Sequence, residues 1–330
     1  LVAYINTDGT GRGYLSMGGS HSLEALINDV ARDVVDPRAS GASLLDRIRA
    51  RNRVQQDLKH GGSESPKGDI PISPLGSGSD YTPFLQHLGI SVLNLSFGGE
   101  SDGGSYHSAY DTFEHYTRFI DPEFVYSATL PKVTGRVTLR LAMTDVLPFR
   151  FSPLVDRIET YLGEIESMAD AMREETARQN ALIESDAYDL AADPLDPLLA
   201  PQKQDDVPYF AFSHIRNALD ALQANAAQAD QAVSRVGDAV LAQNARRINQ
   251  ALYTVERAMI DMEGLPRRPW FRHQIYAPGF YTGYGVKTLP GVREAIEERK
   301  WQEANVEIED LVATLRQMGQ ALERVVEAAE

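Results

Sequence analysis

The chain of 330 residues contains no cysteine, which excludes a disulfide framework but is compatible with either cytoplasm or periplasm. Cationic residues are few, because 32 Lys and Arg stand against 47 Asp and Glu, for a formal charge of −15. That balance disfavours nucleic acid and anionic membranes as partners. No apolar run approaches the ~20 residues that a membrane span requires. With 43% hydrophobic residues, the chain can bury a sizeable core, and two domains are expected.

The first polar residues of the chain follow an apolar run. Residues 1–5 (LVAYI) predict a strand buried on both faces of a mostly parallel sheet, and Asp8 follows its carboxyl end. Ligands bind at that edge of open α/β sheets, and glycines at 9, 11 and 13 predict a permissive loop. Asp8 is therefore a candidate metal ligand, with a turn or a helix cap as the alternative role.

A second candidate ligand is His107, which follows the glycine-rich residues 98–104. A single histidine beside tyrosines is more often structural than a ligand. However, zinc accepts His nitrogen and Asp oxygen, which a chain without cysteine would have to use. Residues 90–97 predict a second buried strand that leads to this loop. Asp8 and His107 are then expected at one edge of one sheet.

Four segments in this order resemble the carboxyl half of the glutamate carboxypeptidase II and transferrin receptor family of zinc peptidases. They are VAYINTD (2–8), LGSGSD (75–80), YHSAYDT (106–112) and GLPRRPWFRHQIYAP (264–278). The resemblance covers nearly the whole chain, apart from an insertion near residues 182–206.

The resemblance implies a site with two zinc ions that share a bridging Asp. In such a site Asp8 is a terminal ligand of one zinc, His107 is a terminal ligand of the other, and Tyr106 donates its hydroxyl to the tetrahedral oxyanion. Two metals activate water and clamp the attacked carbonyl, and a phenol stabilises the charge that develops on its oxygen. The family favours a periplasmic or extracellular location.

The other zinc ligands and the general-base Glu of the family belong to a segment that precedes Leu1. Since residue 1 is not Met, the chain is expected to be the carboxyl portion of a longer dizinc exopeptidase and to be inactive alone. A noncatalytic receptor-like dimerisation or binding module is the alternative, as is a helical dimerisation fragment.

The resemblance also bears on the substrate, which would be a small peptide. Family members that prefer glutamate grip substrate carboxylates with arginines. The corresponding positions hold Met17, Asn94 and Ser96 here, and a lysine position holds Gly283. A preference for acidic side chains is therefore not expected. The residues at substrate-binding positions are Ser77, Gly78, Ser79, Asn94 and Tyr284.

Periodicity divides the chain into an α/β part and an all-α part. Helices are expected over about 23–34, 43–54, 82–88 and 122–146, the last disturbed at Pro131, with a loop over 60–74. Together with the resemblance, this implies α/β followed by all-α: a partial zinc-exopeptidase mixed sheet with flanking helices (1–150) and a helical-bundle dimerisation domain (151–330).

The last helix has an apolar stripe, formed by Ile308, Leu311, Val312, Leu315, Met318, Leu322, Val325 and Val326. By spacing alone such a stripe is usually core, whereas the resemblance favours an intersubunit face and a homodimer through the helical domain.

Overall fold

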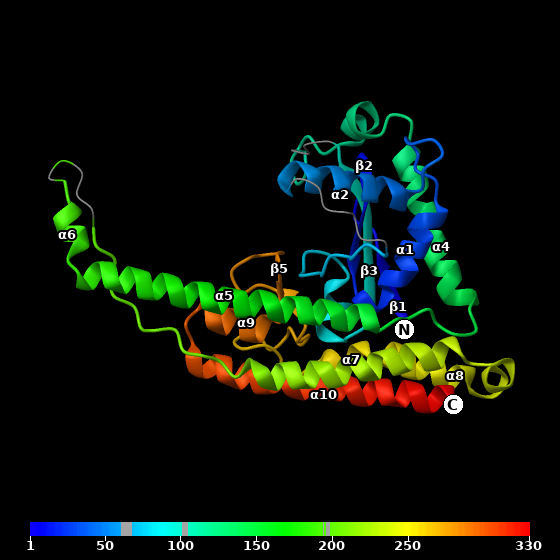
Figure 1. Ribbon diagram of the computed structural model, residues 1–330. Helices are drawn as coiled ribbons and strands as arrows, with labels where there is room; N and C mark the ends of the chain where they lie inside the picture. The colour runs from blue at the N-terminus through cyan, green and yellow to red at the C-terminus, as the bar shows by residue number, and fades with distance from the viewer. Residues whose placement is uncertain (61–67, 101–104, 194, 196–198) are drawn as a thin grey trace.

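The computed structural model describes residues 1–60, 68–100, 105–193, 195 and 199–330. We call residues 1–150 the sheet region and residues 151–330 the helical region (Figure 1). The sheet region contains β1 (Ala3–Asn6), β2 (Gly13–Gly19), η1 (His21–Leu23), α1 (Glu24–Asp33), α2 (Leu44–His60), η2 (Pro83–His87), β3 (Ser91–Gly99), α3 (Phe113–His115), η3 (Tyr116–Ile120) and α4 (Val125–Met143). The helical region contains α5 (Ser152–Glu184), α6 (Ala187–Ala191), α7 (Phe212–Ser234), α8 (Asp238–Thr254), η4 (Glu256–Met259), β4 (Tyr276–Pro278), β5 (Val286–Thr288), α9 (Pro290–Glu297) and α10 (Trp301–Ala329).

In the described sheet region, three strands form a mixed sheet in the order β1-β3-β2. β1 runs parallel to β3, from the pair Ala3 and Ser91 to the pair Asn6 and Asn94, and β2 runs antiparallel to β3. β3 is buried, as its apolar sequence predicts. The expectation that β1 is buried on both faces is wrong for the described chain, since β1 is an edge strand there and its residues 3–5 are only half-buried.

β2 was not expected, because its glycines predicted a loop. Gly13 and Gly19 have φ of 127° and 148°, and an added Cβ would lie 2.3 Å from Gly98 O and 2.1 Å from Val92 O, respectively. Glycine is thus needed where the two strands approach each other closely. Glycine weakens the sequence signal for a strand, but at these positions it permits β2 to pair with β3.

The predicted helices of the sheet region are confirmed in position. α1, α2 and η2 lie where the periodicity placed them, and α2 continues to His60. α4 continues through Pro131 without a break, so this proline does not interrupt the helix as expected. In Figure 1, α1 and α4 lie beside each other and next to the sheet. None of the helices in the described ranges is long and apolar enough to cross a membrane.

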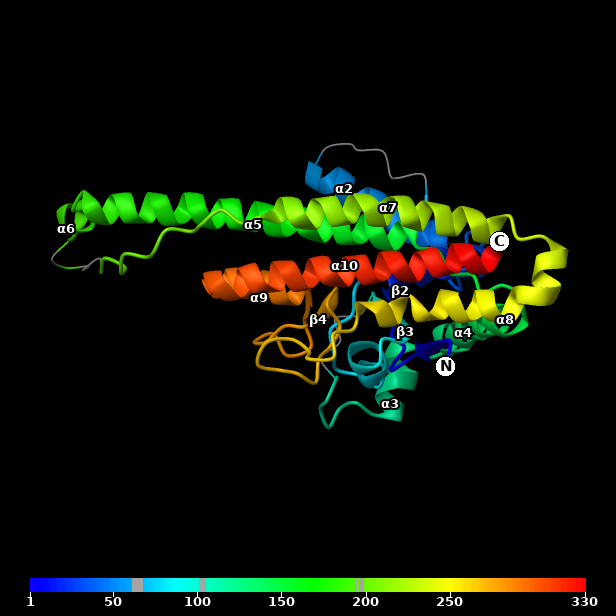
Figure 2. The same ribbon diagram turned by 90° about the horizontal axis from the view of Figure 1, so that it is seen from below.

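The long helices α5, α7 and α10 run alongside one another in the helical region (Figures 1 and 2). Ala226 and Ala229 of α7 are fully buried, which allows close approach of the neighbouring helices. Seven of the eight predicted stripe residues of α10 are also buried within the chain, and Val326 is half-buried. The stripe is therefore core, and its interpretation as an intersubunit face is wrong.

The insertion near 182–206 lies at the far end of α5, which projects beyond the other helices together with α6 (Figure 1). Exposed leucines occur here, with Leu190 at 84% exposure. The return segment is fixed to α5, because the Asn180 side chain exchanges two hydrogen bonds with the Gln204 backbone.

A buried carboxylate joins the two regions. Glu256 of η4 is 2% exposed and accepts hydrogen bonds from Ser20 Oγ at 2.7 Å and from the Tyr276 hydroxyl at 2.8 Å. His273 Nε2 lies 3.4 Å from the same carboxylate oxygen. We call this group the Glu256 cluster; it contains Ser20, Ser22, Ser91, Glu256, His273 and Tyr276. The His273 side chain is completely buried in this cluster.

Candidate functional site

Asp8 belongs to a polar cluster at the carboxyl ends of two parallel strands. The Asn6 side-chain amide donates to Asp8 Oδ1 at 2.6 Å and to Asn94 Oδ1 at 2.9 Å. Ser79 Oγ accepts from Asn6 at 3.0 Å and donates to Asp8 Oδ1 at 2.6 Å. We call Asn6, Asp8, Ser79 and Asn94 the Asn6 cluster. The structure thus brings together three of the residues that the sequence selected, around a buried amide that it had not selected.

The strand register explains this convergence. Asn6 and Asn94 are paired residues of β1 and β3, and Asp8 follows β1 by two residues. Because parallel neighbouring strands end at the same edge of a sheet, polar residues after each strand meet there. The signal for Asn6 was its position as the first polar residue after LVAYI, which shows where the strand ends.

Residues 75–80 form a turn that carries Ser79 to Asp8. Tyr81, just after the turn, is buried and its hydroxyl donates to Ser77 O at 2.9 Å. Burial, together with the charge of Asp8, raises the pKa of Tyr81 to about 12. Tyr81 therefore remains a hydrogen-bond donor at neutral pH and holds the turn beside the Asp8 carboxylate.

Tyr284 comes from a different loop and packs against the same turn. Ser77 N donates to Tyr284 O at 3.2 Å. Gly78 has φ of 102°, and a Cβ at this position would lie 2.6 Å from Tyr284 Cγ. The aromatic ring thus rests directly against a glycine, and 63% of its residue surface stays exposed. Three more predicted substrate-binding residues, Ser77, Gly78 and Tyr284, are in contact with one another.

Tyr106 and His107 form a separate pair. Their rings are stacked with centroids 3.8 Å apart, and Tyr106 is 68% exposed. His107 has a positive φ of 55°, which is uncommon for a residue other than glycine. Within the described ranges, no hydrogen bond or ion pair joins Tyr106 or His107 to the Asn6 cluster. Part of the predicted loop before them, residues 101–104, lies outside those ranges.

Asp8 has the surroundings of a metal-ligating carboxylate, because ligating carboxylates are themselves hydrogen-bonded. Both of its bonds go to Oδ1. A catalytic zinc normally takes three protein ligands. No group of three or more His, Asp or Glu side chains suited to a metal occurs among the described residues. This part of the chain therefore does not by itself fit a zinc ion.

The three positions at which the resemblance led us to look for arginines have neutral side chains with other contacts here. Met17 is buried in β2 with 7% exposure, and Asn94 is bonded to Asn6. Ser96 pairs with Ser16 in the ladder between β2 and β3. Each of these side chains is neutral, so none of the three can form an ion pair with a substrate carboxylate.

The chain resembles proteins of known family. A sequence model of the transferrin receptor-like dimerisation domain matches residues 210–323. The probable glutamate carboxypeptidase LAMP1 of Arabidopsis thaliana is 29% identical over 302 residues, which are 91% of this chain and 36% of that protein. These matches support a relation of the chain to the transferrin receptor-like and glutamate carboxypeptidase family.

Other members of this family carry different activity names. Aminopeptidase NAALADL1 of Rattus norvegicus is 26% identical over 310 residues, which are 89% of this chain and 35% of that protein. The glutamate carboxypeptidase 2 homolog of Caenorhabditis briggsae is 24% identical over 328 residues, which are 94% of this chain and 38% of that protein. The chain thus spans little more than a third of the length of the relatives it matches. Their names support membership of a peptidase family.

Proposed function

We propose that this chain is the carboxyl-terminal portion of a dizinc exopeptidase that acts on small peptides. Residues 1–150 would form the carboxyl part of the peptidase domain, and residues 151–330 would form the dimerisation domain. The observation that carries the proposal is the Asn6 cluster, which holds a hydrogen-bonded Asp8 carboxylate at the carboxyl edge of two parallel strands. Relatives named as carboxypeptidase and aminopeptidase support peptide-bond hydrolysis as the reaction.

In the complete enzyme, Asp8 and His107 would each ligate one zinc ion. The remaining ligands would come from a portion of the protein outside this chain. Within the chain, Asn6 and Ser79 orient the Asp8 carboxylate, and the Tyr106 phenol is available to donate a hydrogen bond to substrate.

The substrate side chain is proposed to be uncharged. The three positions discussed above are neutral, and the loop after β4 offers an aromatic surface, with Phe280 at 38%, Tyr281 at 80% and Tyr284 at 63% exposure. Aromatic surface favours contact with apolar groups. The products formed from peptides with blocked and unblocked ends would show whether the enzyme removes residues from the amino or the carboxyl end.

One experiment on the longer protein tests the roles of Tyr106 and His107. A phenol contact that strengthens as charge develops affects the chemical step, so Tyr106→Phe should lower kcat by about 10²–10³ with little change in KM. His107→Ala should abolish activity and remove one zinc ion in elemental analysis. A Tyr106→Phe enzyme with normal kcat, or a His107→Ala enzyme that retains both metals, would contradict these assignments.

The isolated 330-residue chain provides a second test. With one proposed ligand per metal, it should show no tight zinc binding in calorimetry and no peptidase activity. Two zinc ions bound at nanomolar affinity would overturn the ligand assignment.

A noncatalytic receptor-like dimerisation module is the second candidate function. It is favoured by the match of residues 210–323 to a dimerisation domain. A longer protein that dimerises, but neither binds zinc nor cleaves peptides, would support this candidate against the first.

A further inference from the structure

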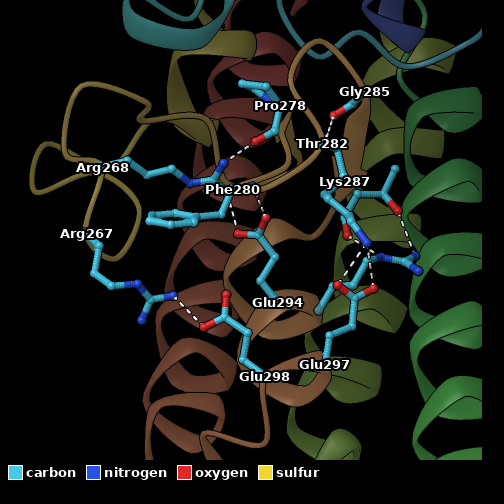
Figure 3. A network of polar contacts seen from close by, with 12 residues as sticks. Arg267, Arg268, Pro278, Phe280, Thr282, Gly285, Lys287, Glu294, Glu297 and Glu298 are labelled. Carbon is cyan, nitrogen blue, oxygen red and sulfur yellow. Dashed lines mark hydrogen bonds and ion pairs between the residues drawn. The ribbon is translucent and has the colours of Figure 1, made fainter.

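The loop that carries Tyr284 is held at its base by an ion pair from the helical region (Figure 3). This loop, residues 279–285, connects β4 to β5. The Arg268 guanidinium donates to Pro278 O and pairs with the Glu294 carboxylate on α9. Phe280 N donates to Glu294 Oε1 at 2.6 Å. Backbone atoms on both sides of Gly279 are therefore bonded to one buried ion pair.

The pair is well shielded from water. The Arg268 and Glu294 side chains are 11% and 10% exposed. Burial lowers the pKa of Arg268 and raises the pKa of Glu294, as expected for charges removed from solvent. Removing one member of such a pair leaves the other charge buried without its partner, which is strongly unfavourable. The anchor should therefore be rigid while both residues are present.

The loop itself is compact enough to transmit this anchoring. Gly279 N donates to Gly285 O at 2.8 Å, and Thr282 Oγ1 donates to the same carbonyl at 2.6 Å. At its far end, Tyr284 O accepts from Ser77 N of the turn beside Asp8. The loop is thus fixed to α9 at one end and to the turn of the candidate site at the other.

We propose that Arg268 and Glu294 are positioning residues, which set the Tyr284 loop against the turn at residues 75–80 and so shape the substrate pocket. The inference rests on the proposed function, in which Tyr284 contacts substrate. It adds that α9, which lies within the part matching the dimerisation domain, determines the placement of a substrate-binding residue.

A neighbouring ion pair provides a matched control. Lys287 of β5 and Glu297 of α9 join the same hairpin to the same helix, with Nζ 2.7 Å from Glu297 Oε1. Their side chains are 25% and 33% exposed, and neither side chain hydrogen-bonds to the backbone of residues 279–285. Figure 3 shows both pairs side by side. Glu297→Gln therefore removes a charge from the same interface without releasing the base of the loop.

The first measurement is amide hydrogen exchange over residues 279–285 in the 330-residue chain. Glu294→Gln and Arg268→Lys should each accelerate exchange at the loop roughly tenfold, because the shared anchor is weakened. Lysine retains the charge but has no planar fork to bond Pro278 O and Glu294 together. Glu297→Gln should leave loop exchange unchanged. Circular dichroism confirms that each variant is folded.

The second measurement is steady-state kinetics in the longer protein. Tyr284 would contribute binding that is similar in the ground state and the transition state, so a displaced loop should raise KM roughly tenfold with little change in kcat. Tyr284→Ala should act in the same direction, and Glu297→Gln should not change KM.

The outcomes distinguish failure of the positioning role from failure of the proposed function. Unchanged loop exchange in both Glu294→Gln and Arg268→Lys overturns the positioning role, whatever Tyr284 does. Faster exchange with unchanged KM also overturns it, provided that Tyr284→Ala still raises KM. If Tyr284→Ala leaves KM unchanged in an active enzyme, the substrate role of Tyr284 in the proposed function fails, and this inference fails with it.

Discussion

Replacing Glu256 by Gln should destabilise the chain substantially, although the two side chains have nearly the same shape. The Glu256 carboxylate receives short hydrogen bonds from Ser20 and Tyr276 in a fully buried position. A bond to a charged group contributes about 1.5–3 kcal/mol and a neutral one about 0.5–1.5 kcal/mol. Neutralising the acceptor of two such bonds should therefore cost about 2–3 kcal/mol of unfolding free energy.

His273 is a further neighbour of the Glu256 carboxylate. His273 Nδ1 faces the backbone amides of Ile275 and Tyr276 at 3.3 and 3.4 Å and accepts from both. His273 Nε2 lies 3.4 Å from Glu256 Oε1. A glutamine would present one neutral oxygen to this site in place of the charged carboxylate.

The effect should depend on pH in a defined direction. Burial by itself raises the pKa of Glu256, but the neighbouring His273, Ser20 and Tyr276 outweigh it, so the pKa lies below its ordinary value of 4.5. The unfolded chain then binds the proton first as pH falls. The stability contributed by Glu256 is complete well above pH 4.5 and is lost as pH falls from there through the folded pKa. The gap between wild type and Glu256→Gln should thus be widest at pH 7 and narrower at pH 4.

Urea unfolding followed by far-ultraviolet circular dichroism at both pH values measures this gap. Glu309→Gln is the control, because Glu309 also pairs with a histidine, His214, at 2.7 Å, but with side chains 61% and 54% exposed. Its effect should stay within about 0.5 kcal/mol. Equal effects at Glu256 and Glu309, or a gap that widens at pH 4, would refute the reasoning.

Three further predictions concern other parts of the chain. Burial, with Asp310 and Glu303 adding their charges, raises the pKa of Glu307 to about 7. Glu307→Gln should therefore stabilise the chain by about 1–3 kcal/mol at pH 8 and by less at pH 4.5; a urea midpoint below wild type at pH 8 would contradict this. Gly78→Ala should displace the Tyr284 ring, since the new Cβ has no room and φ is positive, and unchanged exchange of the Tyr284 loop would disprove it. The 330-residue chain should sediment as one dimeric species over a wide concentration range, whereas a monomer at tens of micromolar would exclude the proposed dimer.

The sequence by itself determined the helices and the two parallel strands. Long segments with regular apolar spacing, such as α1 and α10, depend on local periodicity that any packing partner can satisfy. The apolar run before Asn6 and the run at 90–97 likewise placed β1 and β3. Once both are strands of one parallel pair, the pairing of Asn6 with Asn94, with Asp8 two residues further on, follows from the geometry of the sheet.

Tertiary structure alone decided what each apolar face packs against and which polar groups meet. β2 was missed because its glycines serve contact with β3, a nonlocal requirement that looks like a loop in sequence. The α10 stripe was ambiguous because spacing records an apolar face but not whether it packs within the chain or against another. Glu256 and His273, or Arg268 and Glu294, are separated by 17 and 26 residues, and no local pattern marks them as partners. Their pairing depends on nonlocal packing within residues 256–294, and because these groups are shielded from water, loss of one partner is strongly destabilising.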